Sequence, residues 1–534
     1  MGWIDRNILS LGREMRLSYL PPLMVYVAAG VSGLTGIVGT FFVKEYLGLS
    51  AEFLAALAFW AGIPWALKMP LGHLVDLIWR YKAGLVYLGA ALIATGLCIM
   101  VVLIARPEAM AAIMPIAAWY VLAVLLSPVG YVLQDVVADA MTVEAVPRIG
   151  ADGNPVSDAQ RKLMNTTMQT LGRVAIIGGS LLVAVVNLFM FEGVEQLPQA
   201  AKAEVYARIY ALALVIPAVS VAGVLLQSAL LRRERRRLAA LGMDRGEIEG
   251  AIPGGGGTSP NWWILGGSFA FVLFSLGVGF SDSTYAPEIV FAGSIAIVLF
   301  LIVRITRVLD PESRRTLVGT AMVIFVFRAI PGPGEGISWW MIDELAFDQQ
   351  FFALLAFIGT ALTLAGMFIF RRFMAEHSIM YVVGALTIFG TLLSLPTLGL
   401  YYGLHHWTAA LTNGVVDARF IAIINTALES PLGQIAMIPM LAWIAHSAPD
   451  SLKATYFAVM ASFTNLALSA SQLGTKYLNG IFIVTREVRD KSGVITVPAD
   501  YSELGMLLIV VVAIGFAAPM LVVLIAKLAR LGSA

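Results

Sequence analysis

Long apolar runs alternate with short polar segments along the whole chain. Because a helix rises about 1.5 Å per residue, about 20 apolar residues cross the roughly 30 Å hydrocarbon core of a bilayer. About fourteen runs approach or exceed this length. They cover residues 20–43, 51–68, 83–105, 111–135, 163–191, 205–231, 261–281, 286–306, 316–342, 351–370, 378–404, 418–446, 453–483 and 502–530. The pattern predicts an all-α polytopic membrane protein with about 14 transmembrane helices.

The polar loops between these runs differ in the number of basic residues that they contain. With the N-terminus in the cytoplasm, the inner loops hold about three times as many Lys and Arg residues as the outer loops, most clearly at 232–237 and 304–315. Basic residues are enriched in cytoplasmic loops. We therefore expect a multi-pass protein of the inner (cytoplasmic) membrane with both termini cytoplasmic.

One polar stretch has the composition of a linker. Residues 232–260 carry an arginine cluster and then a glycine run, which cannot pack a core. If 261–306 is an inserted two-helix hairpin, the remainder divides into an N-terminal six-helix half (1–231) and a C-terminal six-helix half (307–534). Two six-helix halves are the layout of the major-facilitator fold, in which the binding site lies between the halves near the membrane midplane, and the hairpin would add two extra helices.

Composition narrows the function classes further. The chain is 59% hydrophobic and 13% charged, whereas a soluble domain carries roughly 25% charged residues. This excludes a soluble enzyme and a nucleic-acid-binding protein, and the net charge of +1 indicates no polyanionic partner. Cys98 is the only cysteine, and no histidines occur at metal-ligand spacing. We therefore expect no metal, no cofactor and, since no nucleophile–base pattern is present, no catalytic residues.

A short motif follows the second run. Gly72 is followed by Asp76 and then by Arg80 and Lys82, a spacing that resembles the cytoplasmic signature of the major facilitator superfamily. A glycine permits close helix approach, and an acid at a helix edge can pair with a base and release it when the halves move. We expect these four residues to form a gate or latch, with ordinary charges at a helix end as the alternative.

Three longer stretches resemble the folate–biopterin transporter family of that superfamily. FFVKEYLGLSAEFLAALAFWAGIPWALKMPLGHLVD (41–76) includes Lys68, and DELAFDQQFFALLAFIGTALTLAGMFIFRRF (343–373) resembles two core helices of the second half. APDSLKATYFAVMASFTNLA (448–467) includes Asn465. The resemblance implies a folate or pterin substrate, a gate role for Lys68 and a substrate-binding role for Asn465.

A further stretch leaves the substrate open. Gln134-Asp135-Val-Val-Ala-Asp139-Ala, followed by Glu144, is similar both to that family and to the related muropeptide permeases. The permeases also commonly carry two extra helices between their halves. A muropeptide is therefore the alternative substrate, and both candidates are organic anions.

Ionisable residues inside the predicted helices are candidate functional groups because isolated charges are costly there. Counted along the helices, Arg173 lies roughly 15 Å, Arg328 about 18 Å and Glu429 about 14 Å from the nearer interface. We expect Arg173 and Arg328 to bind the substrate and Glu429 to carry a coupling proton. Gln169 shares a helix face with Arg173, so it joins the predicted substrate-binding residues.

Two acids lie near the cytoplasmic face. Asp135 and Asp139 are four residues apart, so a helix presents both on one face, where they could meet Arg80 or Lys82. They either carry a coupling proton or form a structural ion-pair network. We expect Asp135 to be the residue that titrates and Asp139 to belong to the gate.

The ninth run contains the most disruptive sequence of the chain. Pro331, Gly332, Pro333 and Gly334 follow Arg328 closely, and such a sequence cannot continue a regular helix. Non-helical backbone at membrane depth is tolerated only where protein or water surrounds it, and discontinuous helices mark transport sites. We therefore expect a helix break beside the substrate site.

These observations favour a monomeric secondary active transporter that works by alternating access, coupled to protons, in the lipid bilayer. Its substrate would be a small organic anion, most simply a folate or pterin. A non-transporting membrane assembly factor built on a transporter scaffold is the alternative from a different class. A membrane enzyme ranks last.

Overall fold

The computed structural model is built almost entirely of helices. Each of the fourteen apolar runs contains at least one helix, and ten helices are long and apolar enough to cross a membrane within the described residues. The described residues are 14–47, 49–66, 68–150, 154–252, 262–279, 281, 283–307, 311–370, 373, 377–433, 435, 453–489 and 495–531.

The chain forms two compact units, which are described separately. Unit 1 comprises Met1–Thr35, Pro70–Val186 and Gln199–Leu265. Unit 2 comprises Gly36–Met69, Asn187–Pro198 and Gly266–Ala534. The first apolar run contributes to both units, because a short 3₁₀ turn (η3, Ser32–Thr35) separates α3 from α4.

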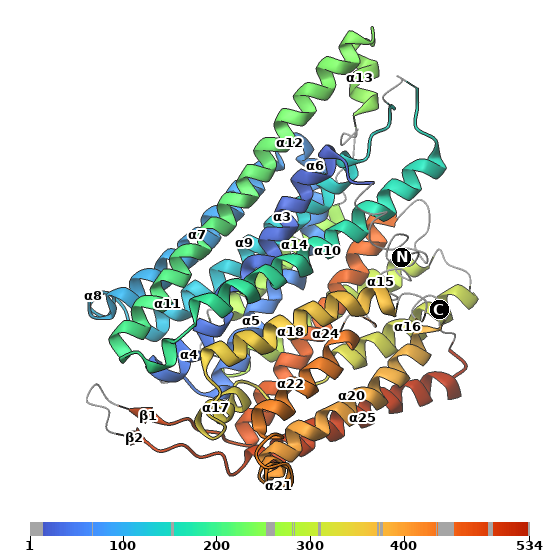
Figure 1. Ribbon diagram of the computed structural model, residues 1–534. Helices are drawn as coiled ribbons and strands as arrows, with labels where there is room; N and C mark the ends of the chain where they lie inside the picture. Colours follow the sequence, from blue (N-terminus) through green and yellow to red (C-terminus); the bar gives the residue numbers. More distant parts are fainter. Residues whose placement is uncertain are drawn as a thin grey trace. The chain divides into compact units, whose positions relative to one another are not determined.

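Unit 1 contains the helices that surround α7 and α9 (Figure 1). Its elements are η2 (Leu17–Tyr19), α3 (Leu20–Val31), α6 (Lys68–Leu77), η4 (Trp79–Tyr81), α7 (Ala83–Ala105), α8 (Pro107–Ala111), α9 (Ile116–Ala145), α10 (Asp158–Met190), α11 (Gln199–Ala213), α12 (Val215–Ala240) and α13 (Arg245–Ala251). The first two residues of α6 belong to unit 2.

Unit 2 contains the remaining helices, among which α20 and α25 run side by side (Figure 1). Its elements are α4 (Gly36–Tyr46), α5 (Ala51–Ala66), η5 (Val194–Gln196), α14 (Trp262–Gly279), α15 (Ala286–Thr306), α16 (Pro311–Arg328), α17 (Gly336–Asp343), α18 (Gln349–Ile369), α20 (Ile379–Tyr401), α21 (Leu404–Leu411), α22 (Ala418–Glu429), η6 (Ser430–Leu432), α24 (Lys453–Ile481), α25 (Leu504–Leu528), β1 (Val488–Arg489) and β2 (Ile495–Val497). Most of α14 lies in this unit.

A short β-hairpin interrupts the all-helical pattern. β1 and β2 pair antiparallel, with Val488 opposite Val497, in the polar segment between α24 and α25. The apolar pattern predicts no strand, so the hairpin is a correction to the expected all-α fold. β-branched residues such as Ile495, Thr496 and Val497 favour a strand, but so short a run gives only a weak pattern.

Small residues allow the helices of unit 1 to approach closely. A Cβ added at Gly130 of α9 would lie 2.5 Å from the Gly89 carbonyl oxygen of α7 and 2.7 Å from the Ile93 side chain. Both distances are far below van der Waals contact. Helices in membranes commonly associate through small residues of this kind, because lipid gives apolar surfaces no strong incentive to leave it.

In unit 2, α5 packs along α24, and the pair α14–α15 packs against both. Phe59 and Ile63 of α5 are buried together with Phe271 of α14, Val290 of α15 and Leu473 of α24. One side of the helix pair is therefore packed against unit 2, while large apolar side chains on its other side, such as Phe269 and Phe300, are exposed.

The Gly130 contact predicts a stability effect. Gly130→Ala should destabilise the protein by about 1–3 kcal/mol, because the new methyl group overlaps backbone that cannot easily move. Thermal unfolding of the purified protein in detergent would then show a lower midpoint than the wild type. Gly84→Ala on α7 is the matched control, since an added Cβ there meets no atom within 4 Å. An unchanged midpoint for Gly130→Ala would contradict the packing argument.

Candidate functional site

A break in the ninth apolar run is the central feature of unit 2. α16 ends at Arg328, and the next helix, α17, begins at Gly336. Residues 330–334 between them are not helical. Pro331 and Pro333 lack an N–H group, so neither can donate the hydrogen bond that would continue α16. The backbone groups of this segment therefore need other partners.

Polar side chains of α24 supply several of those partners. Ser471 Oγ donates to the Ile330 carbonyl at 2.6 Å, and Thr475 Oγ1 accepts from the Gly332 amide at 2.9 Å. Asn479 Nδ2 donates to the Pro333 carbonyl at 3.3 Å. These three side chains recur every fourth residue, so they form one stripe along α24. We call Ser471, Thr475 and Asn479 the α24 polar stripe.

Two glycines allow the break to lie against α24. Gly334 adopts a positive φ of 74°, and a Cβ added there would lie 2.7 Å from Asn479 Nδ2. On the α24 side, a Cβ added at Gly474 would lie 3.1 Å from the Pro331 ring. Backbone conformation and space therefore both favour glycine at these positions.

The far end of α17 joins an ionic cluster. Lys44 Nζ of α4 lies 2.5 Å from Asp343 Oδ1, and both side chains are largely buried. The Tyr501 hydroxyl donates to the other carboxylate oxygen at 2.5 Å. Burial, together with the hydrogen bond and negative charge of Asp343, raises the pKa of Tyr501 well above its ordinary value. Tyr501 therefore remains a neutral donor to Asp343.

Arg486 completes this cluster from the segment before β1. Its Nε donates to the Lys44 carbonyl at 2.8 Å, and its Nη1 donates to the Leu49 carbonyl at 2.7 Å. The guanidinium lies over the Trp339 ring at 5.1 Å. Burial lowers the pKa of Arg486, although the guanidinium of arginine remains protonated in proteins. Lys44, Asp343 and Arg486 are not recognisable as a cluster from the sequence, because their contacts join segments far apart in the chain.

In unit 1, Tyr26 of α3 gathers several predicted site residues. Its hydroxyl donates to Asp139 Oδ1 at 2.7 Å, and the charges of Asp135 and Arg173 also act on it. The tyrosine ring lies about 3.0 Å from the position of a Cβ added at Gly172. Tyr26 thus contacts Asp139 directly, and the charges of Asp135 and Arg173 act on the same phenol. Sequence reasoning missed Tyr26 because α3 shows no charge near it.

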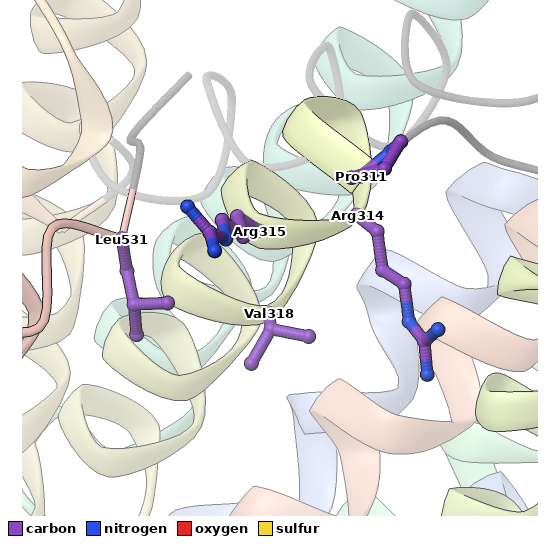
Figure 2. Close-up of a pocket in the computed structure, with 5 residues that line it drawn as sticks. All are labelled: Pro311, Arg314, Arg315, Val318 and Leu531. Atoms are coloured by element: carbon purple, nitrogen blue, oxygen red, sulfur yellow. The ribbon is translucent and has the colours of Figure 1, made fainter.

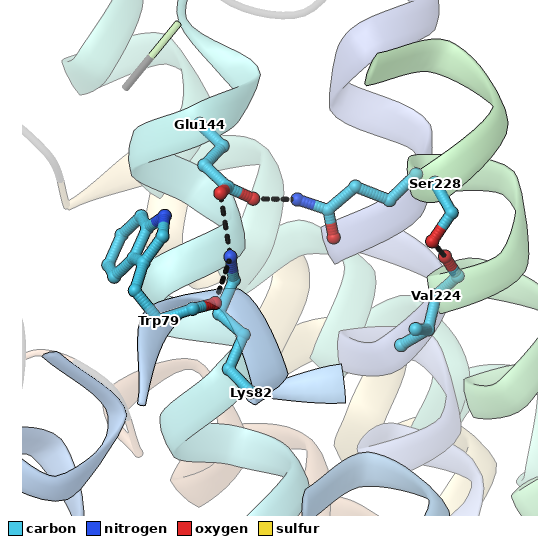
Figure 3. A network of polar contacts seen from close by, with 6 residues as sticks. Trp79, Lys82, Glu144, Val224 and Ser228 are labelled. Atoms are coloured by element: carbon cyan, nitrogen blue, oxygen red, sulfur yellow. Dashed lines mark hydrogen bonds and ion pairs between the residues drawn. The ribbon is translucent and has the colours of Figure 1, made fainter. Parts of the chain in front are cut away.

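A second polar network in unit 1 holds the end of α9 (Figure 3). Lys82 Nζ lies 2.6 Å from Glu144 Oε1, and both side chains are at most 10% exposed. Gln227 of α12 donates to the other oxygen of Glu144. Lys82 also lies over the Trp79 ring at 4.2 Å. Lys82 therefore forms its ion pair with Glu144, whereas the expected partners were Asp135 and Asp139.

The other residues of the predicted gate are placed as follows. Lys68 is the first residue of α6, and Arg80 lies exposed in η4. Among the described residues, no atom lies within 4 Å of a Cβ added at Gly72. The side chains of Asp76 and Gln169 lie outside the described residues.

Two further predicted residues have distinct surroundings. Asn465 Nδ2 of α24 donates to the Trp65 carbonyl near the end of α5 at 3.1 Å. This bond satisfies a helix-end carbonyl and joins α24 to α5. Glu429 is the last residue of α22 and is exposed, and no hydrogen bond or ion pair of its side chain occurs within the described part of the chain.

The structure contains one further concave region of interest. A cavity of about 320 Å³ is lined by Pro311, Arg314, Arg315, Val318 and Leu531. The Arg314 side chain points away from Arg315, so the two guanidinium groups do not converge on one ligand position (Figure 2). Among the described residues, no group of three or more His, Cys, Asp or Glu side chains could hold a metal ion.

Solved structures with the same fold are transporters. A POT family transporter in complex with 5-aminolevulinic acid is similar with a TM-score of 0.59 and 12% identity, covering 96% of each chain. Another POT family transporter, in complex with a thioalcohol-conjugated peptide, has a TM-score of 0.57 and 12% identity, again over 96% of each chain. A mutant of the nucleoside transporter NupG has a TM-score of 0.53 and 10% identity, covering 96% of this chain and 99% of its own. At these identities the similarity establishes the major-facilitator type of fold alone.

A curated relative gives a more specific comparison. The folate-biopterin transporter of Synechocystis sp. (strain ATCC 27184 / PCC 6803 / Kazusa) is 26% identical over 154 residues. This match covers 29% of the present chain and 30% of the relative, so it spans less than a third of either protein.

The family comparison covers much more of the sequence. The family model of the BT1 family matches residues 29–533, which include both units and the broken helix. The resemblance to folate–biopterin transporters expected from the sequence is therefore confirmed, together with a polytopic helical membrane protein of the major-facilitator type. The chain belongs to the BT1 family of membrane transporters.

Proposed function

We propose that this protein is a secondary active transporter that moves a small organic anion by alternating access. The observation that carries the proposal is the family match over residues 29–533. The broken helix at 330–334 adds support, because discontinuous helices supply binding groups in many transporters.

The substrate class we favour is a folate or pterin. The partial match to a folate-biopterin transporter supports this choice, as do the three sequence stretches described above. A muropeptide is the competing substrate, because the 134–144 stretch is similar to both families. A competition panel with both compound classes separates the two.

Arg173 and Arg328 are the proposed anion-binding residues, and Gln169 and Asn465 are proposed to bind the same substrate. Arg328 ends α16 directly before the break, so the α24 polar stripe fixes the backbone that follows it. A cation at a helix C-terminus is also stabilised by the helix dipole. Arg173 follows Gly172, whose contact with the Tyr26 ring anchors that turn of α10.

Protons are the proposed coupling ion, with Glu429 as the carrier and Asp135 as a second titrating group. The end of α22 supports this role, because no hydrogen bond or ion pair within the described part of the chain occupies the Glu429 carboxyl group, which leaves it able to bind a proton. Asp139, Lys82 and the 72–80 motif are the proposed gate. The hydrogen bond of Asp139 to Tyr26 and the ion pair of Lys82 with Glu144 are contacts that a gate motion could break.

The proposal includes a membrane topology. Fourteen helices cross the inner membrane with both termini in the cytoplasm, and the protein acts as a monomer. Residues 1–231 and 307–534 form the two transport halves, joined by the linker 232–260 and the helix pair within 261–306.

Removal of either central arginine should impair transport. Arg173→Gln and Arg328→Gln should each lower the ratio of maximal uptake rate to KM by about ten- to a hundredfold, because a charge-assisted hydrogen bond contributes about 1.5–3 kcal/mol. Uptake of labelled folate or pterin into proteoliposomes provides the measurement. Arg208→Gln is the matched control, since Arg208 forms an exposed ion pair with Glu204 and should leave uptake unchanged.

Two results would contradict the binding assignment or the function itself. Wild-type uptake of a panel compound that survives both arginine substitutions would remove Arg173 and Arg328 from the site. Wild-type protein that moves no compound of either class, while both variants retain cellular function, would support the non-transporting assembly factor.

Proton coupling predicts a selective defect in a Glu429 variant. Glu429→Gln should abolish accumulation driven by an inward proton gradient while counterflow exchange of substrate continues, because the neutral side chain no longer cycles its proton. Both assays use the same proteoliposomes, and Glu204→Gln at an exposed position is the control. Gradient-driven accumulation that is equal in Glu429→Gln and wild type would exclude Glu429 as the carrier.

A further inference from the structure

An ion pair joins α15 to α24 in unit 2. Lys476 Nζ lies 2.7 Å from Glu288 Oε1, and the Tyr477 hydroxyl donates to the same oxygen at 2.7 Å. The two charged side chains are only 20% (Glu288) and 13% (Lys476) exposed. Neither Glu288 nor Lys476 has a role in the transport scheme above.

This ion pair occurs where apolar packing is already present. Val290 of α15 is fully buried with Phe271 of α14 and Leu473 of α24. Replacement of a buried ion pair by apolar side chains is often neutral or stabilising, so such a pair is weak evidence of a stabilising role. The hydrogen bonds of an ion pair are directional, so the pair can instead select one arrangement of two helices. Apolar contacts alone would define that arrangement less strictly.

Lys476 lies on α24 close to the side chains that contact the helix break. Lys476 directly follows Thr475, and consecutive helix residues are about 100° apart around the axis. The ion pair and the α24 polar stripe therefore lie on adjoining faces of the same helix turn. Lys476 contacts Glu288 on one face, and Thr475 contacts the Gly332 amide on the other.

The hydrogen bonds to the break tolerate little rotation. A helix with side chains has a radius of about 5–6 Å, so a rotation of about 20° moves a side-chain tip by about 2 Å. Hydrogen bonds vary by only about 0.5 Å in length. The contacts of Ser471 with Ile330 and of Thr475 with Gly332 would both be lost after such a rotation.

We propose that the helix pair α14–α15 is a positioning element for Arg328, and that Glu288 and Lys476 are its positioning residues. The ion pair sets the rotation of α24, the α24 polar stripe then holds residues 330–333, and this backbone orients Arg328 at the end of α16. The part that concerns substrate rests on the proposed anion-binding role of Arg328. The part that concerns the break stands on the contacts alone.

Amide hydrogen exchange of the full-length protein in lipid nanodiscs, without substrate, tests the structural part. The readout is the exchange rate of the peptide spanning 329–336, compared with a peptide from α7. Glu288→Gln and Lys476→Met should each accelerate exchange across 329–336 by at least about fivefold and leave α7 unchanged. Thr475→Val, which removes the acceptor of the Gly332 amide, should give a similar local increase.

Two further variants show that the effect belongs to this pair. The exchanged pair Glu288→Lys with Lys476→Glu should return the rate toward the wild-type value, because an ion pair is restored. Arg208→Gln breaks an exposed ion pair within a single helix and should change neither peptide. If a single variant exchanges fast throughout the chain, the exchanged pair still decides the outcome, since only rescue supports a positioning role.

The proposal would be overturned if both single variants exchanged across 329–336 at the wild-type rate while Thr475→Val exchanged faster. Failure of the exchanged pair to rescue would do the same. A parallel uptake assay should show a raised KM of at least about fivefold with a nearly unchanged maximal rate in Glu288→Gln. If the protein transports no anion, the exchange result remains valid, so failure of the proposed function is distinguished from failure of the positioning role.

Discussion

Every buried backbone polar group in a membrane needs a hydrogen-bonding partner, and the break between α16 and α17 makes this constraint acute. Two prolines remove backbone donors, and the non-helical segment leaves carbonyls at 330 and 333 without partners of their own helix. The α24 polar stripe meets these needs with side chains at a spacing of four residues. This arrangement constrains its neighbours in unit 2. The hydrogen bonds require α24 to keep one rotational position, and Gly334 has to adopt a positive φ. The break also allows α17 to start in a new direction.

The new direction of α17 places its last residue in the ionic cluster. Asp343 contacts Lys44 of α4 and the Tyr501 hydroxyl. Arg486 donates to one carbonyl of α4 and to one carbonyl of the α4–α5 connection. A continuous helix over 311–343 would carry Asp343 along the axis of α16. The segment from the break to the end of α17 therefore links Arg328, a candidate substrate-binding residue, to the polar contacts of Asp343.

The sequence predicted the features that depend on short stretches of chain. The apolar run 83–105 coincides with α7, and the Pro-Gly pattern at 331–334 marks the place where the ninth run stops being helical. Features that depend on distant pairs were not predictable from one sequence. The partner of Lys82 is Glu144, 62 residues away, and the donor to Asp139 is Tyr26. The spacing of Ser471, Thr475 and Asn479 was a visible signal, but nothing local to α24 identifies the backbone that it satisfies.

The buried ion pairs share a physical property that suits a moving protein. Lys82 with Glu144, Lys44 with Asp343, and Lys476 with Glu288 are each in contact at 2.5–2.7 Å in largely buried surroundings. Desolvation offsets much of the attraction of such a pair, so its net stabilisation is small although its geometric demands are strict. Apolar packing between membrane helices behaves differently, since apolar side chains gain little by leaving lipid and their contacts are not directional. Ionic contacts of this kind suit a helical transporter that must hold one arrangement and then leave it, provided that water or other polar groups replace each partner when the helices move.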